Sequence, residues 1–214
     1  MRHASSMIEL VIAIVIMGIA VMTLPLMLEQ TQKNNEFTLQ QEIILAARTK
    51  LGDTLTYRWD ENSLNNDRIV VLRTNGDSEL NPSIGNRRVG HVHANKRRKF
   101  AFDNNATSNV NLGPDAGDID DIDDFKSVTT SLTGTQANLD YRYTDFNMTT
   151  NVTYVDDNAT YSNTIVSYIF PTTSVNNSTN IKMVTLNITG STSPFTLRTY
   201  SCNIGESEFL RRDY

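Results

Sequence analysis

Residues 4–28 read ASSMIELVIAIVIMGIAVMTLPLML, and this stretch decides the fold. From Leu10 to Leu28 it contains no charged residue. As an α-helix, this run would extend roughly 28 Å, which is close to the ~30 Å hydrocarbon core of a bilayer. The sequence therefore predicts one N-terminal helix that crosses a membrane.

A single carboxylate, Glu9, stands just before the apolar run. An ionisable group inside a membrane segment is costly, so it is a functional hypothesis by default. An ordinary secretory signal places its small residues after a shorter apolar centre. Here Ala4, Ser5 and Ser6 come before a run that is long enough to span. The alternative interpretation is a plain signal anchor, in which Glu9 simply sits near the lipid headgroups.

The start of the chain resembles the class III signal of type IV pilins and of the pseudopilins of type II secretion. In that family a short basic leader ends in Gly or Ala, and a prepilin peptidase cuts there and methylates the new N-terminus. The fifth mature residue is Glu. The family more often has Gly before the cut and Phe after it. The resemblance implies cleavage between Ala4 and Ser5, N-methylation of Ser5, and assembly roles for Glu9, Gly18 and Pro25.

The resemblance also implies partners and a location. In such assemblies the Glu carboxylate pairs with the N-terminal amine of a neighbouring subunit, and in a low dielectric this attraction is strong. The expected partners are other pilin-like subunits, the prepilin peptidase and an inner-membrane assembly platform. Arg2 before the apolar run predicts a cytoplasmic N-terminus and an exported globular domain. The resemblance implies that the membrane is the bacterial inner membrane and that the globular domain is periplasmic.

We expect four regions: a leader over residues 1–4, a membrane and assembly segment over 5–28, an amphipathic helical half over 29–60, and a β-rich domain over 61–214. One helix over residues 5–60 is predicted, with Pro25 bending or loosening it. Its buried stripe is predicted from heptad spacing to contain Phe37, Ile44, Ala47, Leu51 and Leu55.

The C-terminal half is rich in β-branched and aromatic residues. Strands are predicted over residues 69–72, 141–154 and 165–170, and a hairpin over 181–189 and 195–203. In the first strand of this hairpin, Val184, Leu186 and Ile188 share a face, which Lys182 extends. A turn is predicted at residues 74–77. The fold class is therefore α+β, with one long N-terminal helix packed on a C-terminal antiparallel sheet, as in pilins.

Two charged segments lie between the helix and the sheet. A basic loop over residues 87–99 is read as a solvated loop, and the alternative is a surface that contacts DNA or an exported substrate. An acidic segment over residues 115–124 is read as a short helical turn with an acidic outer face. The alternative there is a calcium site, for which the candidate ligands are Asp115, Asp118, Asp120 and Asp121.

Other signals are weaker. Three Asn-x-Thr sequences with an upstream Asp are candidates for glycosylation, and chance matches are the alternative: Asn105, Asn147 and Asn158. The net charge of −5 does not suggest binding to nucleic acid, and the single cysteine excludes an intrachain disulfide. Neither a catalytic motif nor a cofactor motif is found. The predicted function is a minor pilin-like subunit, and a tip or receptor module is the alternative.

Overall fold

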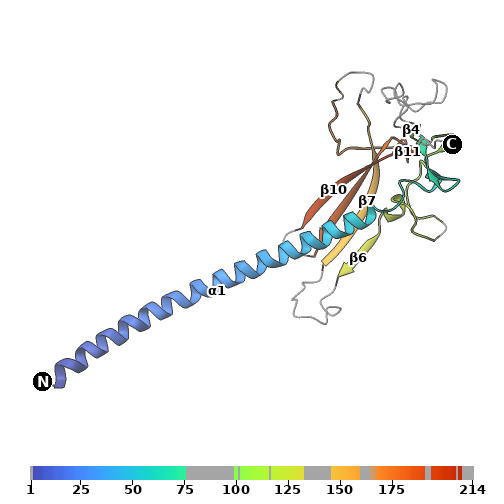
Figure 1. The fold of residues 1–214 in the computed structure, drawn as a ribbon. Helices are drawn as coiled ribbons and strands as arrows, with labels where there is room; N and C mark the ends of the chain where they lie inside the picture. Colours follow the sequence, from blue (N-terminus) through green and yellow to red (C-terminus); the bar gives the residue numbers. More distant parts are fainter. Residues whose placement is uncertain are drawn as a thin grey trace, which may run out of the picture.

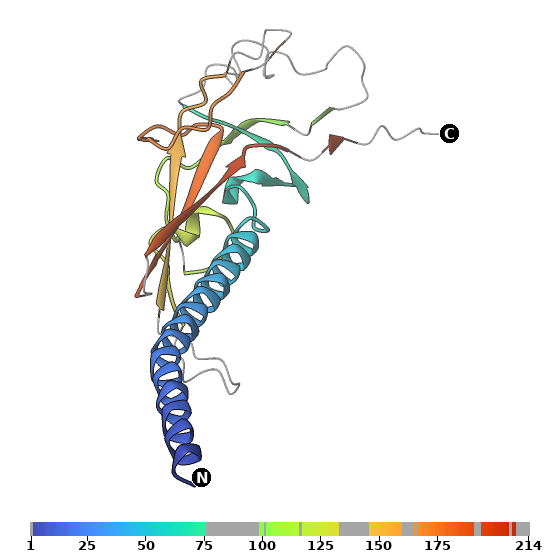
Figure 2. The same cartoon turned by 90° about the vertical axis from the view of Figure 1, so that its left-hand side faces the viewer.

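The computed structural model describes residues 2–75, 99–100, 102–115, 117–132, 146–159, 165, 167–190, 194–205 and 207–208. One long helix, α1 (Arg2–Thr54), leads into a C-terminal antiparallel sheet, which confirms the α+β class. The last turns of α1 lie along this sheet, while its N-terminal part projects away from it (Figure 1). The turned view in Figure 2 shows the same separation.

The main sheet is antiparallel and has the order β10-β9-β7-β6. Two short strands pair with one side of the central strand β7: β6 pairs with its beginning and β8 with its end. The other side of β7 pairs along its whole length with β9. The bounds are β6 Thr129–Leu132, β7 Phe146–Val155, β8 Ser174–Val175, β9 Ile181–Thr189 and β10 Phe195–Cys202.

The predicted C-terminal hairpin is confirmed. Strands β9 and β10 pair from Ile188 opposite Phe195 to Ile181 opposite Cys202. Val184, Leu186 and Ile188 are buried together, as their shared face predicts. The predicted strand over 141–154 is found as β7, and its first five residues lie outside the described residues.

Short elements surround the end of the helix. Strands β1 (Leu64–Asn65) and β2 (Arg68–Ile69) form a hairpin whose turn residues, Asn66 and Asp67, both have positive φ. This turn type suits Asn and Asp. The turn predicted at residues 74–77 lies partly outside the described residues. The remaining elements are β3 Val71–Arg73, β4 Lys99–Phe100, β5 Phe102–Thr107, β11 Ser207–Glu208, and the 3₁₀ turns η1 Glu61–Ser63 and η4 Asp123–Phe125.

The face of α1 that packs on the sheet differs from the predicted heptad stripe. The buried residues follow the 3.6-residue period of a straight helix: Ile43, Ala47, Leu51 and Thr54. Ala47 and Leu51 confirm the prediction, whereas Phe37, Ile44 and Leu55 are exposed. Phe37 precedes the turns that pack on the sheet, Ile44 points about 100° away from the buried Ile43, and Leu55 follows the end of α1.

Helix α1 ends at Thr54, earlier than the predicted residue 60. The reason is tertiary, because the chain turns to bury Trp59 and Asp60 at the end of the sheet. The indole N–H of Trp59 donates to the Ser201 carbonyl at 3.2 Å. In the other direction, α1 continues across Pro25 without a break.

The predicted strand over residues 165–170 is wrong for the residues that the structure describes there. They form no strand, and Ile165, Ile169 and Phe170 are exposed. The ring of Phe170 instead packs on the rings of Tyr168 and Tyr200, with centroids 4.8 and 4.5 Å apart. A high strand propensity means only that a side chain suits a pleated surface, and it does not supply a neighbouring strand. Both sides of β7 are already paired, so this segment has no ladder to join there.

Two adjacent isoleucines test the helix–sheet contact. Ile43 is 4% exposed and belongs to the core, whereas Ile44 is 47% exposed. We expect Ile43→Ala to lower the free energy of unfolding by about 2–5 kcal/mol, because it leaves a cavity. Ile44→Ala, the matched control, should cost far less. The measurement is denaturant unfolding of the full chain in detergent, followed by the fluorescence of its only tryptophan, Trp59. Equal losses would contradict the packing.

Candidate functional site

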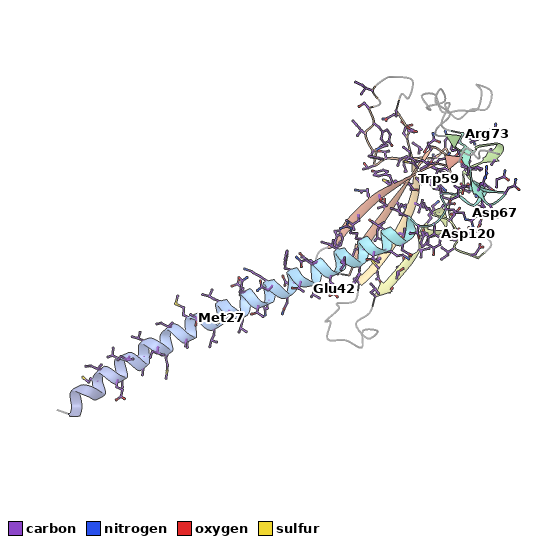
Figure 3. The ribbon with its side chains drawn as sticks, in the orientation of Figure 1. Met27, Glu42, Trp59, Asp67, Arg73 and Asp120 are labelled. Atoms are coloured by element: carbon purple, nitrogen blue, oxygen red, sulfur yellow. The ribbon has the colours of Figure 1, made fainter. Side chains whose placement is uncertain are left out.

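An uncovered apolar surface runs along the N-terminal part of α1. All the large hydrophobic side chains between residues 7 and 28 are exposed. Among the described residues, this is the one helix that is long and apolar enough to cross a membrane. The stretch around Met27 stands clear of the sheet, and Glu42 marks where the helix reaches it (Figure 3). Such a surface needs a lipid or protein environment, because exposed apolar area of this extent is unfavourable in water.

The predicted assembly residues all lie on this projecting part. Glu9 is exposed, and no other charge follows it along the helix until Glu29. Gly18 faces open space, since a Cβ added there would meet no atom within 4 Å. Folding of the chain itself therefore does not require a glycine at this position. Ala4 and Ser5 lie in the first turns of α1, and cleavage and methylation there stay predictions.

The second part of the site is the junction that fixes this helix to the sheet. Its centre is the ammonium group of Lys182 on β9, whose side chain is completely buried. Nζ donates to the Trp59 carbonyl at 2.5 Å, to Asp123 Oδ1 at 2.5 Å and to Asp60 Oδ2 at 3.5 Å. The same atom lies 4.3 Å from the centre of the Trp59 ring and 5.7 Å from that of Tyr154. All three protons of the ammonium group thus have acceptors.

Asp60 is tied to several segments at once. One of its carboxylate oxygens accepts from the Asn62 N–H at 3.1 Å, and the other accepts from the Asn109 N–H at 3.0 Å. Burial nevertheless raises the pKa of Asp60, and the Lys182 ammonium only partly offsets this effect. Burial likewise raises the pKa of Tyr154, whose hydroxyl donates to the Asn109 carbonyl at 2.5 Å.

The predicted acidic outer face of the 115–124 segment is wrong for three of its residues. Asp121, Asp123 and Asp124 are buried around η4, together with Ile122 and Phe125, while Ile119 is exposed. Asp121 Oδ1 accepts from the Asp123 N–H at 2.7 Å, and Asp124 Oδ2 accepts from the Asp120 N–H at 2.9 Å. The carboxylates therefore organise their own loop by binding its backbone N–H groups.

Other carboxylates of this segment face solvent or a cation. Asp120 lies beyond the end of α1 (Figure 3). It forms an ion pair with Arg58. Asp115 and Asp118 are exposed. Within the described part of the chain, no three His, Cys, Asp or Glu side chains gather where they could hold a metal ion. The structure therefore does not bring Asp115, Asp118, Asp120 and Asp121 together as the calcium alternative requires.

The remaining predicted sites are the three glycosylation candidates and the basic loop. Asn147 lies in β7 with its side chain exposed, and Asn158 is exposed just after the same strand. Asn105 lies within β5. Glycosylation at these positions stays a prediction. The basic loop lies outside the described residues except for Lys99, and so does any contact between it and the acidic segment.

Sequence reasoning missed the lysine junction, although it noticed one sign of it. Lys182 continues the apolar face of β9, which is an unusual place for a lysine unless a partner is buried with it. Its partner Asp123 could have been suspected in the same way, because it stands beside the apolar residues Ile122 and Phe125. The pairing of these two positions, 59 residues apart, could not be read from local pattern.

No protein-family model matches this chain, and neither does any curated protein or any solved structure.

A pH measurement tests the buried carboxylates. The pKa of Asp121 is raised from its ordinary 3.8 to about 7, mainly by burial and next by the neighbouring Asp123, while Lys182 acts in the opposite sense. A raised folded-state pKa stabilises the fold below pH 3.8, and this contribution is lost as the pH rises through about 7. We expect Asp121→Asn to be more stable than the wild type above pH 7, by on the order of a few kcal/mol, because Asn cannot ionise.

The readout is the free energy of unfolding from Trp59 fluorescence across this pH range. Asn keeps an oxygen that can accept from the Asp123 N–H, so the loop retains that contact. Asp118→Asn is the control, since Asp118 is an exposed carboxylate of the same segment. Superimposable pH curves for the wild type and Asp121→Asn would rule out the effect.

Proposed function

We propose that this chain is a minor pilin-like structural subunit of a type II secretion or type IV pilus machine. Residues 5–28 would hold it in the bacterial inner membrane, with the N-terminus in the cytoplasm and the globular domain in the periplasm. It would then leave the membrane and enter a short fibre. The observation that carries this proposal is the uncovered apolar helix with a lone carboxylate, Glu9, near its free end.

The apolar surface of α1 extends beyond the part that a membrane would cover. Phe37, Ile44 and Leu45 are all exposed, and they lie after the charged pair of Glu29 and Lys33. A bilayer core of ~30 Å is already filled by residues 10–28. Single exposed apolar residues are common. Here Phe37 precedes the turns that pack on the sheet, and Ile44 and Leu45 lie on the outer side of those turns, so the exposed apolar surface favours contact with neighbouring subunits over a plain anchor.

Glu9 gives this assembly its register. In a bundle of apolar helices, an unpaired carboxylate is costly, and an amine from a neighbouring N-terminus removes most of that cost. Cleavage after Ala4 would create such an amine on Ser5, four positions before the carboxylate along the chain. Gly18 leaves the helix surface open midway, where a neighbouring backbone could approach closely.

Replacing Glu9 tests this role. We expect Glu9→Ala to reduce recovery of the subunit in assembled fibres by about tenfold or more, since losing one partner of a buried ion pair costs about 3–5 kcal/mol. Membrane insertion should be unchanged, because the apolar run is intact. Glu29→Ala is the matched control: it removes an exposed helix carboxylate whose ion pair with Lys33, at 2.7 Å, contributes little.

Two outcomes would count against the proposal. Normal fibre incorporation of Glu9→Ala would remove the pairing role. N-terminal sequencing should find Ser5 first in both the wild type and the variant, because the peptidase reads the junction and not Glu9. Retention of residues 1–4 in a host that carries a prepilin peptidase would remove the pilin-like assignment itself.

A further inference from the structure

We propose that Lys182 and Asp123 condense to an amide bond, so that the folded domain cross-links itself. The bond would join Nζ of Lys182 on β9 to Cγ of Asp123 at the start of η4. This inference does not depend on the proposed function, which uses neither residue.

The amine of Lys182 and the carboxyl group of Asp123 lie within hydrogen-bond distance of each other. Nζ of Lys182 donates to Oδ1 of Asp123 at 2.5 Å. The two side chains are 0% and 5% exposed, so neither can exchange this partner for water. Their backbones are held independently, Lys182 by the ladders of β9 on both sides and Asp123 by η4. Reactants fixed in this way have a large entropic advantage over free groups.

A second carboxyl group is placed to move protons. Oδ2 of Asp60 lies 3.5 Å from Nζ, and its side chain is 1% exposed. Burial raises the pKa of Asp60, so this group holds a proton more readily than an exposed aspartate does. The buried set thus contains one amine, one carboxyl group to be attacked and one carboxyl group to relay protons. Asp121 and Asp124 are buried nearby in the acidic segment and bind backbone N–H groups there.

The reaction balances without any co-reactant. The ammonium group of Lys182 gives one proton to the Asp123 carboxylate, which leaves a neutral amine and a neutral acid. The nitrogen lone pair attacks Cγ, and the C–N bond forms as the C=O π bond opens. Asp60 takes the next proton from nitrogen and returns it to the departing hydroxyl. The C–O bond breaks, one water molecule leaves, and an amide remains.

The surroundings favour the amide over the ion pair. The Trp59 ring covers Nζ at 4.3 Å and the Tyr154 ring lies 5.7 Å away, so the charges have little access to water. Desolvating two charges is expensive, and condensation removes both. The amide N–H that remains can still donate to the Trp59 carbonyl, which Nζ already contacts at 2.5 Å. The cross-link would close a loop between positions 59 residues apart and so restrict the unfolded chain.

Peptide mass spectrometry of the full chain, purified in detergent, tests the bond. Trypsin cleaves after a free lysine but not after an acylated one. We expect no cleavage after Lys182, and a branched peptide that joins residues 100–126 to residues 143–198 and is lighter than their sum by one water molecule. Fragmentation should place the branch at Lys182 and Asp123. Complete cleavage after Lys182, with two linear peptides from protein whose Trp59 emission is native, would overturn the proposal.

Variants separate the roles. Asp123→Ala should abolish the branched peptide, and Asp123→Asn should restore it with the wild-type mass, because its amide loses ammonia and leaves the same product. Asp60→Asn should fold and keep Lys182 cleavable, since the relay is lost. Asp118→Asn, an exposed control, should remain fully linked. A linked Asp60→Asn variant would contradict the relay, and a linked Asp123→Ala variant would contradict the attachment site.

Discussion

The buried side chain of Lys182 joins three separate parts of this protein. Lys182 comes from the middle of the sheet, Trp59 and Asp60 from the segment that follows the helix, and Asp123 from the acidic turn. A charge without water must keep its partners, because removing one from a buried pair costs about 3–5 kcal/mol. The exit of the chain from α1 is therefore fixed to β9, and this contact sets how the helix lies on the sheet.

The two ends of the long helix have different surroundings. Its last turns bury Ile43, Ala47 and Leu51 against the sheet, as an ordinary amphipathic helix does. Its first turns have apolar residues on all sides, and none of the residues that the structure describes covers them. A helix that is hydrophobic all round belongs in a membrane or inside a bundle. The globular domain thus presents a rod whose surroundings must come from outside the molecule, which is the physical basis of the proposed assembly.

The acidic segment shows how composition can mislead. Its carboxylates suggested a solvated surface or a cation site, yet Asp121 and Asp124 bind the backbone N–H groups of their own loop. Short acidic side chains often replace backbone partners in this way. The same loop then presents Asp123 to the lysine, so the acidic residues shape the loop and also balance a charge from the sheet.

The sequence by itself determined the N-terminal helix, the hairpin of β9 and β10, and the order of one helix followed by a sheet. These features follow from local periodicity, which depends only on how side chains repeat along a helix or strand. Tertiary structure decided which helix face is buried, where α1 ends, and why the described residues within 165–170 form no strand. It also decided that Lys182 is paired. Each of these features depends on contacts with residues far along the chain. A short-range sequence pattern cannot show which distant residue supplies such a contact.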